Sequence, residues 1–130
     1  MKIMVCYDSS EPAKEALKVA KDHAKAFDAS IEVVSTLAKG LEDEVGKIQA
    51  AEKELDYAKS FFDNAGIACN KHLLIHGLTS GEDLVQFSKD NKVDEIIIGI
   101  KKRSKVGKLV FGSTAQYVIL ETDCPVVTVK

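Results

Sequence analysis

The apolar residues of this 130-residue chain fall into nine successive segments, which alternate between the two-residue period of strands and the longer period of helices. The expected strands are rich in apolar and β-branched residues and cover residues 2–7, 31–36, 69–76, 94–99 and 125–129. Four helical segments separate them. Since crossovers between parallel strands are almost always right-handed, this order predicts a single α/β domain over residues 1–130. We expect an open, doubly wound sheet of five parallel strands with helices on both faces.

Local signals predict where the helices begin. Ser9 or Ser10 can cap the first helix, and Thr79 with Glu82 forms a capping box for the third. Ser113 is expected to cap the fourth helix. Helical spacing places several large apolar residues on the inner faces of the first, second and fourth helices, among them Phe27, Val45, Tyr117 and Leu120.

Composition and cysteine count exclude several classes of protein. Hydrophobic residues make up 45% and charged residues 29% of the chain, as in ordinary soluble domains. No apolar run approaches the ~18 residues that a membrane helix needs, so we expect a cytoplasmic protein without membrane contact. The three cysteines have no C-x-x-C spacing and are expected to be small buried side chains: Cys6, Cys69 and Cys124. No structural metal is predicted.

Positive charge is concentrated in one short segment. The formal net charge is −2, yet the stretch between Gly99 and Gly112 contains no acid and five cations: Lys101, Lys102, Arg103, Lys105 and Lys108. We refer to residues 101–108 as the basic loop. A mildly acidic protein with one basic loop is not expected to bind nucleic acid broadly. The loop does suit one small polyanion.

The strand ends indicate where a ligand would bind, because open parallel sheets bind ligands beyond the carboxyl ends of their strands. These ends present Asp8, Thr36, His76 and Gly99. After the fourth strand, glycines and cations lead to Ser113 at a helix start. This combination suits phosphate, because glycine admits close backbone approach and a helix N-terminus attracts anions. The spacing fits neither a Walker A loop nor a G-x-G-x-x-G motif.

Catalysis has little support in the sequence. The strand ends bring together no Ser-His-Asp or Cys-His set and no pair of carboxylates, and His76 fits a structural role. Asp8 alone could position a metal ion or a water molecule, so a slow ATPase stays open as an alternative. The basic loop could equally be a solvated segment.

Both ends of the chain resemble the universal stress protein family. The opening IMVCYDSSEPAKEAL is similar to that family's first strand, acidic turn and helix. The ending GSTAQYVILETDCPVVTV is similar to its Gly-Ser helix start and closing Pro-Val strand. Members that bind ATP carry G-x2-G-x9-G-[ST] after the fourth strand. Here Gly99, Gly112 and Ser113 match that spacing, whereas Lys102 occupies the position of the second glycine.

The resemblance implies a strand order of 3-2-1-4-5 and a stress regulator that binds ATP, ADP or AMP, with Mg2+ held through the phosphates. Asp8 and Thr36 would flank the adenine and ribose, with Ile98 and Gly99 beneath them. The phosphates would be surrounded by Lys101, Lys102, Gly112, Ser113 and Thr114.

The resemblance also implies assembly and signalling. A homodimer would pair through the last strand, residues 125–129, and the dimer would signal to protein partners of unknown identity. An exposed edge strand invites such pairing on physical grounds as well. In the alternative that Lys102 favours, a protein of the same fold binds no nucleotide and docks partners through the basic loop.

Overall fold

The computed structural model describes residues 1–40, 42–76, 79–101 and 112–130. Within these ranges, five strands form one parallel sheet in the order β3-β2-β1-β4-β5. The strands are β1 (Lys2–Cys6), β2 (Ser30–Ala38), β3 (Cys69–His76), β4 (Glu95–Gly99) and β5 (Val126–Val129). The predicted fold class is confirmed, and so is the strand order that the family resemblance implied.

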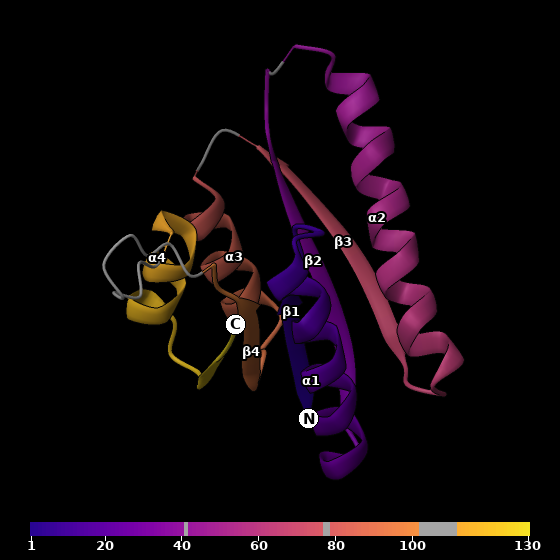
Figure 1. Cartoon of the computed structure of the whole chain (residues 1–130). Helices are drawn as coiled ribbons and strands as arrows, with labels where there is room; N and C mark the ends of the chain where they lie inside the picture. Colours follow the sequence, from indigo (N-terminus) through magenta and orange to yellow (C-terminus); the bar gives the residue numbers. More distant parts are fainter. Residues whose placement is uncertain (41, 77–78, 102–111) are drawn as a thin grey trace.

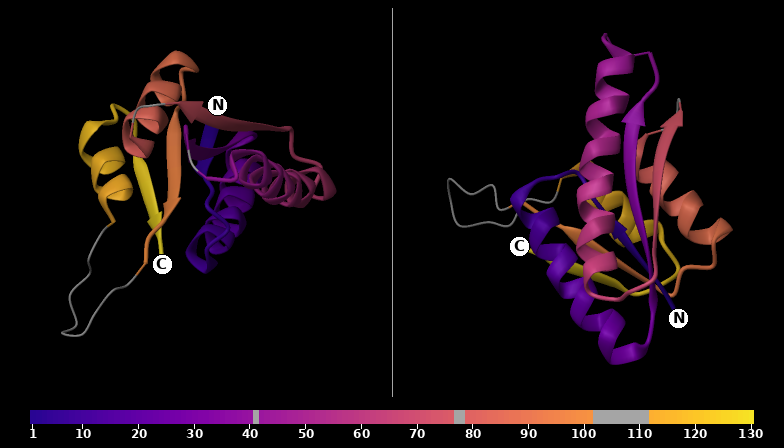
Figure 2. Two further views of the ribbon diagram at one scale, coloured as in Figure 1. Left: turned by 90° about the horizontal axis from the view of Figure 1, so that it is seen from above. Right: turned by 90° about the vertical axis from the view of Figure 1, so that its right-hand side faces the viewer.

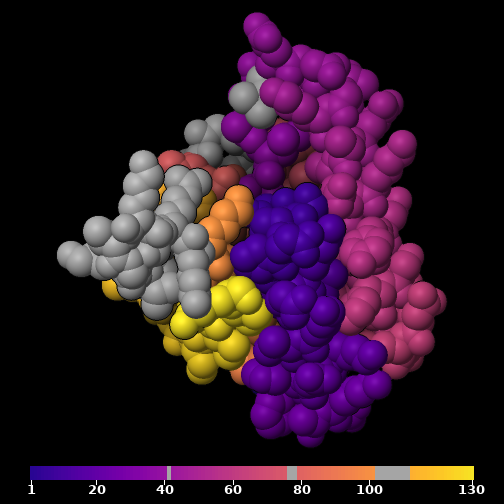
Figure 3. All heavy atoms as spheres, in the orientation of Figure 1, coloured from indigo at the N-terminus to yellow at the C-terminus, as the bar shows by residue number. Residues whose placement is uncertain are grey.

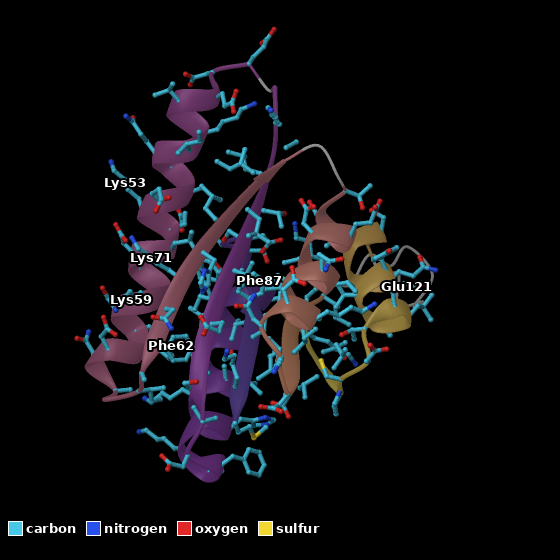
Figure 4. All side chains as sticks on the ribbon, turned by 180° about the vertical axis from the view of Figure 1, so that it is seen from behind. Lys53, Lys59, Phe62, Lys71, Phe87 and Glu121 are labelled. Carbon is cyan, nitrogen blue, oxygen red and sulfur yellow. The ribbon has the colours of Figure 1, made fainter. Side chains whose placement is uncertain are left out.

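Helices cover both faces of the sheet (Figure 2). They are α1 (Glu11–Phe27), α2 (Glu44–Asn64), α3 (Ser80–Asp90) and α4 (Ser113–Glu121). α1 and α2 share one face, where Phe62 is fully buried, and α3 and α4 share the other, where Phe87 packs (Figure 4). Alternate residues of β1 supply the two cores, since Ile3 and Val5 face α1 and α2 while Met4 faces α3 and α4. No helix in the described ranges is both long and apolar enough to cross a bilayer.

Two of the predicted helix caps are confirmed and one is wrong. Ser10 and Thr79 each accept the backbone N–H three residues further along, both at 3.3 Å. At the start of α4, however, the N-cap is Gly112, whose backbone is extended with φ −63° and ψ 159°. Ser113 is therefore the first helical residue, and its N–H group is one of those that an α-helix leaves unbonded.

Four apolar residues predicted on inner helix faces are instead exposed: Phe27, Val45, Tyr117 and Leu120. The first ends α1, next to the left-handed turn at Asp28, and the second lies in the first turn of α2, whose buried residues begin at Leu55. α4 is a short helix that buries Ala115 and Val118. Tyr117 and Leu120 lie outside this buried side of the helix.

β2 and β3 are longer than their neighbours, and this difference shapes the edge of the sheet. Cys6 at the end of β1 pairs with Val34, yet β2 continues to Ala38 and stays paired with β3 up to His76. β2, β3 and α2 therefore extend beyond the carboxyl ends of β1 and β4 (Figure 1). The ends of β1 and β4 lie at the foot of a wall formed by β2 and α2.

Candidate functional site

A cleft of about 680 Å³ opens at the carboxyl ends of β1, β2 and β4. The turn before α1 and the first turns of α3 and α4 contribute to its rim, and one side of α2 forms a further wall. Figure 3 shows α2 and the end of β2 standing above the surface of the N-terminal segment. The cleft is lined by eight residues that were predicted to bind a nucleotide: Asp8, Thr36, Ile98, Gly99, Lys101, Gly112, Ser113 and Thr114. Lys102 and the remainder of the basic loop lie outside the described residues.

The turn after β1 fixes the direction of Asp8. Its Oδ1 accepts the backbone N–H of Ser10 at 3.0 Å and the Ser10 hydroxyl at 2.5 Å. Ser9 between them has a φ of 60°, in the left-handed region that tight turns use. Because Ser10 also caps α1, the carboxylate of Asp8 is tied to the start of that helix. Asp8 is thus a positioned hydrogen-bond acceptor at the exposed side of the cleft.

Gly99 ends β4 directly beside the start of α1. A Cβ at this position would lie 2.5 Å from the carbonyl carbon of Pro12 and 2.6 Å from the backbone nitrogen of Ala13. No side chain can come this close to backbone atoms. The absence of a side chain at Gly99 therefore allows α1 to pack directly against the end of β4. This contact places the turn that carries Asp8 beside the end of β4.

Two hydroxyl groups fasten the extended end of β2 to its neighbours. Ser35 Oγ donates to the carbonyl oxygen of Tyr7 at 2.5 Å, and Thr36 Oγ1 donates to Ser80 Oγ at 2.9 Å. The N–H of Tyr7 donates in turn to the carbonyl oxygen of Val34 at 2.9 Å. β2 is therefore held to β1 and α3 at the cleft. The Thr36 oxygen can still accept a hydrogen bond, since a hydroxyl has two lone pairs.

The rim formed by α4 and the end of β4 favours an anion. Gly112 and Ser113 are exposed, and the N-cap Gly112 has no side chain that could bond the first N–H groups of α4. A Cβ on Gly112 would meet no described atom within 4 Å, so open space adjoins the helix start. Lys101 is exposed on the same rim. Its charge and the helix dipole both attract a negatively charged group to this place.

Sequence reasoning missed the wall that α2 contributes. Ala50, Ala51 and Glu54 line the cleft from this helix, which packs on the face of the sheet opposite to α4. Tyr7 lines the cleft as well, although it is only 3% exposed, and its hydroxyl has no hydrogen-bond partner in the described part of the chain. An unpaired buried hydroxyl costs about 1–3 kcal/mol. No local pattern in the sequence indicated that α2 would line the cleft.

The Tyr7 phenol is protonated at neutral pH, and burial moves its pKa further from that pH. Burial raises the pKa of its phenol to about 12, and the negative charge of Glu54 is the next largest cause. At neutral pH the phenol therefore keeps its proton and acts as a hydrogen-bond donor. Beyond α2, the cleft lining that the sequence did not predict comprises Cys6, Ser9, Ser10, Val34, Ser35, Ser80, Leu84, Ile100 and Ala115.

Comparison with known proteins places this fold and cleft in a family. The model of the universal stress protein family matches residues 1–130. The chain belongs to that family. A universal stress protein of Thermus aquaticus is 32% identical to it over 98% of this chain and 97% of the relative.

Two solved structures of universal stress proteins from Archaeoglobus fulgidus have the same architecture. The first superimposes with a TM-score of 0.90 at 35% identity and covers 100% of this chain and 98% of that one. The second, solved in complex with dAMP, gives a TM-score of 0.86 at 30% identity with the same coverage.

The thiol in the cleft of this universal stress protein is not an activated nucleophile. Burial, followed by the charge of Asp8, raises the pKa of Cys6 to about 12, and burial raises that of Cys69 to about 12 as well. Both thiols stay protonated at neutral pH, and the thiolate is the reactive form. Both are buried as predicted, whereas Cys124 is only half-buried and lies 3.4 Å from the Thr122 hydroxyl. The described ranges contain no group of three or more His, Cys, Asp or Glu residues that could hold a metal ion.

Proposed function

We propose that this universal stress protein binds an adenine nucleotide, ATP, ADP or AMP, in the cleft and acts as a cytoplasmic stress regulator without catalysing a reaction. The observation that carries the proposal is the convergence of β1, β2, β4 and α4 on one cleft lined by the predicted residues. The relative from Archaeoglobus fulgidus that was solved with dAMP supports the same class of ligand. Three free thiols fit a reducing compartment.

The two sides of the cleft suit the two halves of a nucleotide. Lys101, the Ser113 hydroxyl and the free N–H groups of α4 would hold the phosphates, and Mg2+ would be bound through those phosphates. The nucleoside would lie beside Asp8 and Thr36, whose oxygens can accept hydrogen bonds from it. Ile98 and Gly99 would lie beneath.

Binding rather than turnover suits the side chains of the cleft. The Asp8 carboxylate already accepts two hydrogen bonds from Ser10, and the Cys6 thiol is protonated. Neither group is an activated base or nucleophile. The slow ATPase considered from the sequence is therefore not part of the proposal.

A calorimetric titration with magnesium-ATP tests the proposal. The protein is first stripped of co-purified nucleotide. We expect saturable binding of one nucleotide per chain, and its loss in Gly112→Val, because the larger side chain would fill the open space at the start of α4. No heat up to millimolar ATP, at two temperatures, would contradict the proposal and favour the docking module that uses the basic loop.

We further propose a homodimer paired through β5, which is an edge strand of the sheet. Ile96 N–H donates to the carbonyl oxygen of Pro125 at 3.0 Å, and Ile100 N–H donates to that of Val129 at 2.7 Å. Alternate residues of β5 thus bond to β4, and the N–H of Thr128 points to the open edge.

Thr128→Pro should therefore convert the dimer into a monomer while leaving the pairing of β5 with β4 intact. Proline removes the N–H that would bond to the second copy, and edge strands tolerate it where that group faces outward. Sedimentation at tens of micromolar measures the change, with Thr128→Val, which keeps the N–H, as the matched control. A monomeric wild-type protein would contradict the homodimer.

A further inference from the structure

The two ends of α2 differ in how firmly they are held. After the last turn, Gly66 has a φ of 72° and its N–H donates to the carbonyl oxygen of Asp63 at 3.0 Å. The N–H of Ile67 donates to the carbonyl oxygen of Phe62 at 3.0 Å, which completes a Schellman motif between two buried side chains. At the start, Asp43 lies in the left-handed region with a φ of 51°, and its side chain caps no N–H group of the described chain. α2 is therefore anchored more firmly at its end than at its start.

Burial follows the same division. We call residues 44–54 the first half of α2 and residues 55–64 the second half, which supplies the buried residues of the helix: Leu55, Ala58 and Phe62. The first half, which the structure describes in full, contributes no buried side chain, and Val45 is 69% exposed. Figure 1 shows the first half projecting past the other helices, beside the ends of β2 and β3. Because packing of an apolar face holds most protein helices in place, the first half is held less firmly than the second.

The local sequence and the sheet give the first half little further support. Gly46 lies in its first turn, where glycine is a poor helix former, and a left-handed residue other than glycine precedes the helix. By the alternation of side chains, Leu37 of β2 and Ile75 of β3 lie on the face of the sheet that α2 covers. Both are only half-buried. The contact between the first half and the strand ends is thus incomplete.

The first half also carries the part of α2 that lines the cleft. Ala50, Ala51 and Glu54 belong to this lining, and Ala50 is exposed in the empty cleft. A molecule that fills the cleft covers the two methyl groups and adds the apolar contact that the first half lacks. A ligand shifts an equilibrium toward the form with which it makes more contacts. An occupied cleft therefore favours the docked helix.

We propose that the first half of α2 is a lid, which opens in the empty protein by losing helical structure and docks on the sheet when the cleft is filled. The second half and its Schellman motif are the fixed base of the lid. The outer surface of the lid, which includes Val45, then differs between the empty and the filled protein, and a partner protein can read this difference. The ligand that closes the lid rests on the proposed function, whereas the opening is a property of the ligand-free chain.

Native-state hydrogen exchange measures the opening. The amides of residues 48–54 bond within the first half, and those of residues 59–64 bond within the second. Without ligand, we expect the former to exchange roughly a hundredfold faster, because local opening is enough to expose them. Magnesium-ATP at about 100 times its Kd should slow them by up to about a hundredfold, since only the docked lid contacts the nucleotide. Amides at the end of α1, at the opposite end of the sheet, are the control and should exchange equally fast with and without nucleotide.

Two proline variants test the same division without any ligand. Gln49→Pro and Ser60→Pro each break α2 at an exposed position, because proline has no N–H and clashes with the carbonyl group four residues earlier. The loss in Gln49→Pro is limited, since a broken lid simply stays open. Its urea midpoint should fall at least about threefold less than that of Ser60→Pro. Its Kd for magnesium-ATP should nevertheless rise roughly tenfold, because the form that binds is less populated.

The outcomes separate this inference from the proposed function. If residues 48–54 exchange as slowly as residues 59–64 without ligand, or if Gln49→Pro lowers the urea midpoint as much as Ser60→Pro does, the inference is overturned whatever binds in the cleft. If calorimetry shows binding of magnesium-ATP but the exchange of residues 48–54 is not slowed, the lid is overturned while nucleotide binding stands. Absence of binding contradicts the proposed function and the closure, while exchange in the ligand-free protein and the proline pair still decide whether the first half opens.

Discussion

Gly99→Ala should lower the free energy of unfolding of the ligand-free protein by about 3 kcal/mol, because the added methyl group would clash with the backbone. The new Cβ would lie 2.5 Å from the carbonyl carbon of Pro12 and 2.6 Å from the nitrogen of Ala13. A side chain could rotate away from such a clash. These backbone atoms can yield only if the first turn of α1 moves away from β4, and the turn that carries Asp8 would move with it. Urea unfolding followed by circular dichroism measures the loss.

Gly112→Ala is the matched control for Gly99→Ala. Gly112 has a φ of −63°, which any residue can adopt, and a Cβ there would meet no described atom within 4 Å. Its cost should stay below about 1 kcal/mol, the range of an altered N-cap. Equal losses in the two variants, or a fully stable Gly99→Ala protein, would show that the contact between α1 and β4 does not require glycine.

The two glycines differ in a way that the sequence did not predict. The family resemblance assigned Gly99 and Gly112 to one nucleotide-binding motif, and both do line the cleft. Gly99 also has a structural role, because the absence of a side chain at this position lets α1 pack against β4. That contact joins residues far apart in the sequence, so no local pattern could indicate it.

The order of strands and helices was predictable because each element carries its own periodicity. The triple isoleucine 96–98, for example, lies in the strand that was predicted over residues 94–99, and all three residues are buried, as in a strand covered on both faces. The exposed residues Phe27 and Leu120 were mispredicted for a physical reason. Helical spacing identifies an apolar stripe, but the area that the sheet covers decides which part of the stripe is buried.

The α2 wall could not be predicted from local patterns for a similar reason. Glu54 reaches the cleft because β2 and β3 run beyond β1 and carry α2 with them. The sequence predicted a strand over residues 31–36, whereas β2 extends to Ala38. Because the predicted strand ended two residues too early, the sequence did not indicate that α2 lines the cleft.

Ser113→Asp should weaken nucleotide binding by about a hundredfold and slightly raise the stability of the ligand-free fold. The substitution places a carboxylate at the first residue of α4, where the phosphates are proposed to lie. Two unit charges 4 Å apart at a protein surface repel by up to about 4 kcal/mol, which solvent and salt reduce. The same carboxylate interacts favourably with the N-terminal end of the helix dipole, by about 0.5 kcal/mol. Affinity and stability should thus change in opposite directions.

This opposition makes the variant informative, because a damaged fold would lower both quantities. Calorimetric titration with magnesium-ATP and urea unfolding of the ligand-free protein are measured on the same preparation. Gln116→Glu adds an equal charge to α4 at an exposed position outside the cleft lining, and it should bind within a few-fold of wild type. If Ser113→Asp bound ATP as tightly as Gln116→Glu does, the phosphates would not lie at the start of α4. The charge of Lys101 and the free N–H groups of α4 would then have to serve another anion.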